Sequence, residues 1–150
     1  MEIEIKEIES TRVAYMRYVG LPQKATSCLP KIFKSIKGKS SGAPIFYYLT
    51  NDPNKKEVEM EICVPTEETP NQSGVEVKIL PHEKVLSTTW IGPYTKLSQA
   101  YQILMDYVDE HQIPVTGIAK EVYIKGPGML MIGNPNKYVT EIHFILKNEE

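Results

Sequence analysis

The chain has 150 residues, of which 41% are hydrophobic and 24% charged, and its formal net charge is −2. That length is typical of one domain, and that balance is typical of a folded globular protein. Lys and Arg are scattered along the sequence, whereas a nucleic-acid-binding protein usually carries a basic face, so no direct contact with nucleic acid is expected.

The N-terminus and the cysteines exclude further classes. The first ten residues, MEIEIKEIES, have neither the basic nor the apolar segment of a signal peptide. No apolar run reaches the roughly 20 residues that a membrane-spanning helix needs. Cys28 and Cys63 are far apart, which argues against a disulfide framework and against a cysteine zinc site. We therefore expect a cytoplasmic protein with no metal, no cofactor and no membrane contact.

The first half of the chain has the pattern of four strands and one helix. Apolar residues that alternate with polar ones predict strands, and apolar residues at i, i+3, i+4 and i+7 predict a helix. In chain order we expect a strand around Ile3 and Ile5, a strand at 12–19, a helix at 25–36, and strands at 44–49 and 57–64. Because Pro30 fits only near a helix start, the helix is expected to begin near Thr26 or Ser27.

The second half shows the same order of elements. Strands are expected at 75–80 and 84–91, a helix from Thr95 to about His111, and strands at 118–125 and 138–146. A Gly92-Pro93 turn separates the second strand from the helix, and a loop at 126–136 precedes the last strand.

An internal repeat explains this agreement. Residues 3–13 (IEIKEIESTRV) align without a gap with residues 75–85 (VEVKILPHEKV), and the alignment continues through the turn and the helix. A repeat of this kind indicates one structural unit used twice. We expect a single domain, residues 1–150, with copy one at 1–65, a linker at 66–74 and copy two at 75–150. The predicted fold class is α+β: a tandem ββαββ repeat with pseudo-twofold symmetry, eight mostly antiparallel strands and two main helices.

The last strands of the two copies differ in the residues around a shared glutamate. Glu61 aligns with Glu141 if the second copy carries an insertion, most simply in the loop 126–136. Side chains alternate between the two faces of a strand. Glu61 then shares a face with other glutamates and is expected to be solvated. The opposite face of this strand, which carries Val58, Met60, Ile62 and Val64, is expected to pack on the helix.

In the second copy the alternation gives a different environment. Residues Thr140, Ile142, Phe144 and Leu146 are expected to face the helices. Glu141 then lies on the opposite face with Val139, His143 and Ile145. A poorly solvated carboxylate gains a positive partner or a raised pKa, and such groups are frequent at functional sites. The alternative is an exposed Glu with a Lys or Arg neighbour across the sheet.

Several aromatic residues are expected near the strand of Glu141 or at matching positions in copy one. They are Trp90, Tyr123, Tyr15, Tyr47, Tyr48 and Tyr94. For any one of them, packing in the core is the alternative to ligand contact. As a set around Glu141, with His143 beside it, they predict an aromatic box with one negative charge. Such a box suits a flat, lipophilic or cationic ligand through stacking, cation–π attraction and ion pairing.

The sequence shows no motif for metal binding, for nucleophilic catalysis or for phosphate binding. The histidines His82, His111 and His143 show no metal-ligand spacing, and the sequence contains neither a GxSxG motif nor a phosphate-binding glycine loop. A dyad of Cys63 and His143, which occupy matching strand positions, is the remaining nucleophile hypothesis.

Four segments together resemble a known family. They are VG-L-P after the second strand, W-I-G-P-Y before the second helix, E-V-Y on the seventh strand and K-Y-V-T-E-I-H on the last. They resemble the GyrI-like effector-binding domain, the ligand-binding fold of MerR-type and AraC-type multidrug-responsive regulators. The resemblance covers nearly the whole chain. It implies a pocket with Glu141 at its base and with Trp90 and Tyr123 in its walls.

The resemblance also implies what the protein does. No helix-turn-helix segment precedes or follows the domain, so a stand-alone member that binds small hydrophobic or cationic xenobiotics is expected. Inhibition of a protein partner such as DNA gyrase is one alternative. The other is hydrolysis of strained small electrophiles, with Glu141 as the catalytic general base that activates water.

Overall fold

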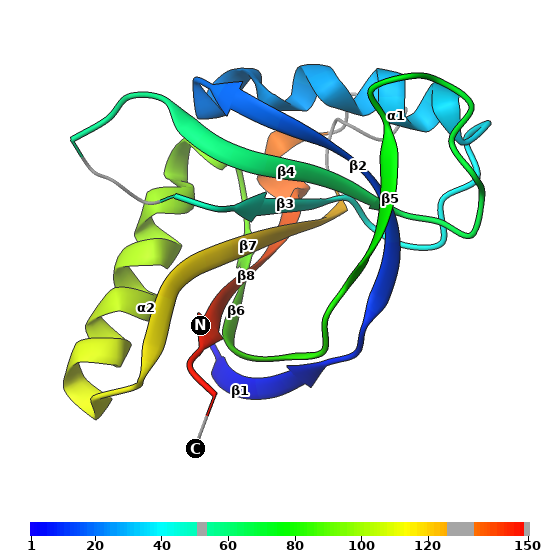
Figure 1. Cartoon of the computed structure of the whole chain (residues 1–150). Coiled ribbons are helices and arrows are strands. Elements are labelled where there is room, and N and C mark those ends of the chain that lie inside the picture. Colours follow the sequence, from blue (N-terminus) through cyan, green and yellow to red (C-terminus); the bar gives the residue numbers. More distant parts are fainter. Residues whose placement is uncertain (51–53, 126–133, 149–150) are drawn as a thin grey trace. The chain divides into compact units, whose positions relative to one another are not determined.

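The computed structural model describes residues 1–50, 54–125 and 134–148, which form eight strands and two α-helices (Figure 1). These elements make up two compact units. Unit 1 comprises Met1–Ile8 and Glu83–Glu150, and unit 2 comprises Glu9–His82. The α+β fold class predicted from the sequence is confirmed.

Unit 2 is an antiparallel sheet with a helix, and its strands follow the order β3-β4-β2-β5. Its elements are β2 (Thr11–Gly20), the 3-10 helix η1 (Pro22–Cys28), α1 (Leu29–Ser35), β3 (Ile45–Tyr48), β4 (Val58–Pro65) and β5 (Glu76–Leu80). The apolar stripe of α1 covers one face of the sheet, and Ile32, Met60 and Ile62 are fully buried.

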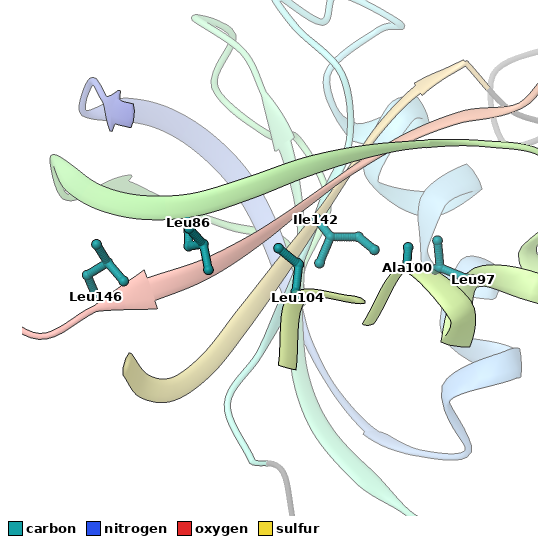
Figure 2. Close-up of a cluster of buried hydrophobic side chains, with 6 residues drawn as sticks. All are labelled: Leu86, Leu97, Ala100, Leu104, Ile142 and Leu146. Carbon is teal, nitrogen blue, oxygen red and sulfur yellow. The ribbon is translucent and has the colours of Figure 1, made fainter. Parts of the chain in front are cut away.

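Unit 1 is likewise an antiparallel sheet with a helix, and its strands follow the order β1-β6-β8-β7. Its elements are β1 (Ile3–Ile8), β6 (Glu83–Ile91), the 3-10 helix η2 (Tyr94–Lys96), α2 (Leu97–His111), β7 (Val115–Lys125), the 3-10 helix η3 (Pro135–Lys137) and β8 (Val139–Leu146). The core between α2 and the sheet consists of Leu86, Leu97, Ala100, Leu104, Ile142 and Leu146 (Figure 2). Placing Ile142 and Leu146 toward the helix was therefore a correct prediction.

The first helix differs from its prediction. The helix expected at 25–36 divides into the 3-10 helix η1 and the seven-residue helix α1. The cause is Pro30, which occupies the first turn of α1, where its missing N–H costs no hydrogen bond. The second helix begins with the 3-10 turn at Tyr94 and ends at His111, as expected.

The first strand of each sequence copy pairs with the second strand of the other copy. Strand β1 pairs with β6 of copy two, with Ile5 opposite Leu86, and β5 pairs with β2 of copy one, with Val77 opposite Ala14. Each unit therefore takes one strand from the other copy, and the units do not coincide with the copies 1–65 and 75–150. The pseudo-twofold symmetry and the single-domain boundary stay predictions. Within the described ranges, no helix combines the length and apolar character needed to cross a membrane.

Candidate functional site

The sheet of unit 1 carries polar and aromatic residues on the face that α2 covers. In the register of the strands, Trp90 on β6 and Tyr123 on β7 both lie opposite Thr140 on β8. Glu121 lies opposite Ile142, which belongs to the core under α2. Because directly opposed residues of antiparallel strands share a face, these residues all point toward the helix.

Glu121 is a buried carboxylate held by tyrosines. The residue is 4% exposed. The hydroxyl of Tyr101, on α2, donates to its Oε2, and the hydroxyl of Tyr123, two residues along β7, donates to its Oε1. Both carboxylate oxygens therefore act as acceptors of a phenol hydroxyl. A buried charged group needs such donors, so the two phenols hold Glu121 in place.

Further aromatic rings surround this carboxylate. The ring centroid of Tyr94 lies 5.4 Å from that of Tyr123 and 5.0 Å from that of Tyr138. Burial, followed by Tyr138 and the charge of Glu121, raises the pKa of Tyr94 to about 12. Tyr94 therefore keeps its proton at neutral pH. Its hydroxyl is also close enough to Glu121 to interact with it electrostatically. Tyr94, Tyr101, Tyr123 and Trp90 are each partly exposed, so the aromatic surface reaches solvent above a buried charge.

The turn before α2 positions the tryptophan. Trp90 Nε1 donates to the carbonyl of Pro93 at 3.2 Å. The ring lies against Gly92, where an added Cβ would be 3.3 Å from three ring atoms and where φ is +148°. Glycine is required for both reasons. Tyr18 in unit 2 makes the corresponding bond, from its hydroxyl to the carbonyl of Leu21 at 2.7 Å.

Thr140 is a further polar residue of this face. It is fully buried, and among the residues that the structure describes its Oγ1 has no hydrogen-bond partner. We call the group formed by Glu121, Tyr101, Tyr123, Tyr94, Trp90 and Tyr138 the Glu121 site, and Thr140 adjoins this site on the same face of the sheet.

The same positions in unit 2 are apolar. With Ile62 and Ile142 equivalent in the aligned last strands, Phe46, which lies opposite Ile62, takes the position of Glu121. By the same register, Met60 takes the position of Thr140. Phe46 is 2% exposed and Met60 is fully buried. An ordinary hydrophobic core therefore suffices for the fold at these positions, and the polar groups are particular to unit 1.

Glu141 and His143 lie on the opposite face of the unit 1 sheet. Glu141 is opposite Thr89, the neighbour of Trp90, so its side chain points away from Trp90 and Tyr123. Lys6 Nζ donates to Glu141 Oε1, and His143 Nε2 lies 2.8 Å from the same oxygen. Glu141 has thus gained a positive partner, one of the two outcomes expected for it.

These partners lower the pKa of Glu141. The hydrogen bond from His143, followed by the hydrogen bond and charge of Lys6, outweighs burial and lowers the pKa from 4.5 to about 2. Glu141 is therefore ionised at all physiological pH values. So acidic a carboxylate is a weak general base at neutral pH.

Stability should depend on Glu141 below pH 4.5. The folded state binds this proton more weakly than the unfolded state, so the stabilisation is present above pH 4.5 and is lost as pH falls toward 2. Urea unfolding should show Glu141→Gln less stable at pH 7 by on the order of 2 kcal/mol, and closer to wild type at pH 3. The exposed Glu110→Gln is the control. An equal difference at both pH values would contradict this prediction.

His143 is a buried, neutral histidine. It is 3% exposed, and burial, followed by the charges of Lys120 and Lys6, lowers its pKa below 6.5 against the opposing hydrogen bond to Glu141. Because Glu141 accepts from Nε2, the proton sits there, and Nδ1 has no hydrogen-bond partner in the described part of the chain. Lys120, opposite His143 in register, pairs with Glu83 at 3.0 Å.

A second pH dependence follows from His143. The unfolded state takes up this proton below pH 6.5, whereas the folded state resists it, so stability falls as pH drops below 6.5. The slope should approach about 1 kcal/mol per pH unit. His143→Gln should flatten the decline between pH 6.5 and 5 in chemical unfolding. The exposed control His82→Gln should show the same decline in stability as the wild type. If His143→Gln also declined as steeply as the wild type, the assignment of this pH dependence to His143 would be refuted.

The prediction that Glu61 is solvated is wrong. Its side chain is 12% exposed, less than the 21% of Glu141, and it pairs with Lys78. The cause is the strand exchange, which places β5 and its Lys78 beside β2. Lys78 aligns with Lys6 and Glu61 with Glu141, so both units contain the same lysine–glutamate pair.

The remaining residues predicted for the site belong to unit 2. Tyr15 lies under Lys78, whose Nζ is 4.6 Å from the ring centroid, and Tyr47 lies opposite Glu61 on the same face. The residues predicted from the sequence thus fall into three groups. Trp90 and Tyr123 are in the Glu121 site, Glu141 and His143 are across the sheet, and Tyr15 and Tyr47 are around Glu61.

Sequence reasoning missed Glu121, Tyr101, Tyr138 and Thr140. The E-V-Y segment contained the signal, because Glu121 and Tyr123 alternate on one face of a predicted strand. Only the pairing of β7 with β8 shows that this face is buried. No group of three or more metal-ligating side chains occurs among the described residues.

Comparison with known proteins identifies the family. Residues 1–147 match the model of the GyrI-like small molecule binding domain. The chain belongs to the GyrI-like family. Comparison of this GyrI-like domain with curated proteins gives no significant match.

Solved structures share its fold. The EcmrR C-terminal domain aligns with a TM-score of 0.82 at 20% identity, covering 99% of this chain and 98% of that one. SAV2435 bound to tetraphenylphosphonium aligns with a TM-score of 0.68 at 15% identity, covering 99% and 95%. A hydrolase from Listeria innocua aligns with a TM-score of 0.62 at 14% identity, covering 95% and 90%.

Proposed function

We propose that this GyrI-like domain binds lipophilic organic cations at the Glu121 site. The observation that carries the proposal is the buried carboxylate of Glu121, which accepts from Tyr101 and Tyr123 at a position where unit 2 has Phe46. A buried charge is costly to maintain and is not needed for the fold, so its benefit is to a ligand.

The chemistry of the site selects the class of ligand. Phenol and indole faces attract a cation through their quadrupoles and provide apolar contact area, and a carboxylate beneath them adds ionic attraction in a poorly solvated setting. A neutral aromatic molecule gains the apolar contact alone. The family is one of small-molecule binding domains, and SAV2435, which shares the fold, is bound to a lipophilic cation.

Two carboxylates of unit 1 compete for this role. The sequence predicted a pocket centred on Glu141, with His143, Trp90 and Tyr123 around it. We favour Glu121 because it shares a face with Trp90 and Tyr123, whereas Glu141 is ion-paired with Lys6 on the other face. Hydrolysis with Glu141 as general base is disfavoured by its pKa of about 2.

Two ligands of similar shape test the proposal. Isothermal titration should give saturable binding of tetraphenylphosphonium and at least about tenfold weaker binding of tetraphenylborate, which has the same four phenyl groups but a negative charge, because only the cation gains the ionic attraction. Equal affinities would show a merely apolar site and would refute the role of the carboxylate.

A further inference from the structure

Thr140 adjoins the Glu121 site on the same face of the sheet, and the binding of a simple cation does not use its hydroxyl. Its side chain is fully buried, and its hydroxyl lacks a partner among the described residues. A buried hydroxyl without a hydrogen bond destabilises the folded state, and nearly all such groups in proteins are satisfied. Met60, at the same position in unit 2, shows that an apolar side chain fits the fold there.

The surroundings of the hydroxyl define what can reach it. Thr140 lies between Trp90 and Tyr123 in the register, and Tyr138 precedes it by two residues, directly before β8 begins. The ring of Tyr94 packs against both Tyr123 and Tyr138. Aromatic side chains therefore flank the hydroxyl, and a ligand that enters the Glu121 site and displaces one of these rings comes into contact with it.

The spacing from the carboxylate is set by the sheet. Tyr123, opposite Thr140, is two residues beyond Glu121 on β7. Thr140 and Glu121 are therefore diagonal neighbours on adjacent strands, with their Cα atoms roughly 7–8 Å apart and their side chains on one face.

We propose that Thr140 is a specificity-determining residue, and that the site favours cations bearing a hydrogen-bonding group roughly 7–8 Å from the part of the ligand that meets the carboxylate. This inference rests on the function proposed above and names its ligand class more narrowly. The cationic part contacts Glu121 and the aromatic rings, while the polar group satisfies the threonine hydroxyl. A cation without such a group leaves the hydroxyl unsatisfied and gains nothing from it.

Two probes and two substitutions test the inference. Rhodamine 6G carries N–H groups and an ester, whereas tetraphenylphosphonium has no hydrogen-bonding group. Thr140→Val, which keeps the branched shape and removes the hydroxyl, should weaken rhodamine 6G about fivefold and leave tetraphenylphosphonium unchanged or tighter. Thr140→Ser, which keeps the hydroxyl, should bind both probes as the wild type does. Without ligand, Thr140→Val should raise the Tm because an unsatisfied buried group is gone.

The outcomes separate this inference from the proposed function. If Thr140→Val changes both affinities by the same factor, or neither, the role of Thr140 is overturned while cation binding stands. If Glu121→Gln fails to weaken either probe, or neither probe binds the wild type, the proposed function fails and the inference fails with it. A lowered Tm in unliganded Thr140→Val would also overturn it, because the hydroxyl would then have been satisfied.

Discussion

Replacing Glu121 with Gln should weaken the binding of tetraphenylphosphonium by about 30-fold or more. The substitution keeps the size of the side chain and a carbonyl acceptor for one tyrosine hydroxyl, but it removes the negative charge. A buried charge interacts strongly because little solvent screens it, and Glu121 is 4% exposed. Isothermal titration of both proteins at the same ionic strength measures the difference.

The matched control is Glu141→Gln, the same chemical change across the same sheet. Its carboxylate is ion-paired with Lys6 and points away from Trp90 and Tyr123, so the affinity should change less than about threefold. If Glu141→Gln lost affinity and Glu121→Gln did not, the carboxylate of the site would be Glu141, as the sequence predicted.

The second large effect concerns stability and the two tyrosines. Glu121→Met removes the acceptor of the hydroxyls of Tyr101 and Tyr123, so it should reduce the free energy of unfolding by about 1–3 kcal/mol. Removing the hydroxyls as well, in the triple variant Tyr101→Phe, Glu121→Met, Tyr123→Phe, leaves an apolar group of similar shape. That variant should be as stable as the wild type or more stable, because the two hydroxyl donors and their carboxylate acceptor are removed together.

Urea unfolding of the wild type, the single variant and the triple variant measures this contrast, with cation binding as a second readout. The triple variant should lose its preference for tetraphenylphosphonium over tetraphenylborate while remaining folded. Additive destabilisation, with the triple variant less stable than Glu121→Met, would show that the three side chains do not act as one network.

Much of the fold was predictable because it depends on local periodicity. The apolar stripe of α2 and the alternation along β8 gave the helix and its contact with Ile142 and Leu146. The W-I-G-P-Y segment marked the turn where Trp90 lies on Gly92. These features need only the neighbouring residues in the chain.

The pairing of strands was not predictable in the same way. The segments IEIK at 3–6, in β1, and VEVK at 75–78, where β5 begins, have the same alternation. Each therefore fits the same partner strand, and the exchange leaves no trace in the pattern. The error for Glu61 follows directly, since only the exchange places Lys78 beside it. The identity of the buried carboxylate likewise depends on which face of β7 is covered.

The sole tryptophan of the chain, Trp90, lies in the Glu121 site and tests the central claim most directly. Titration with tetraphenylphosphonium, followed by tryptophan fluorescence, should give a saturable change whose midpoint matches the affinity from calorimetry. In Glu121→Gln the midpoint should move to about 30-fold higher concentration. Calorimetric binding without a fluorescence change, or the same midpoint in Glu121→Gln, would contradict binding at this site.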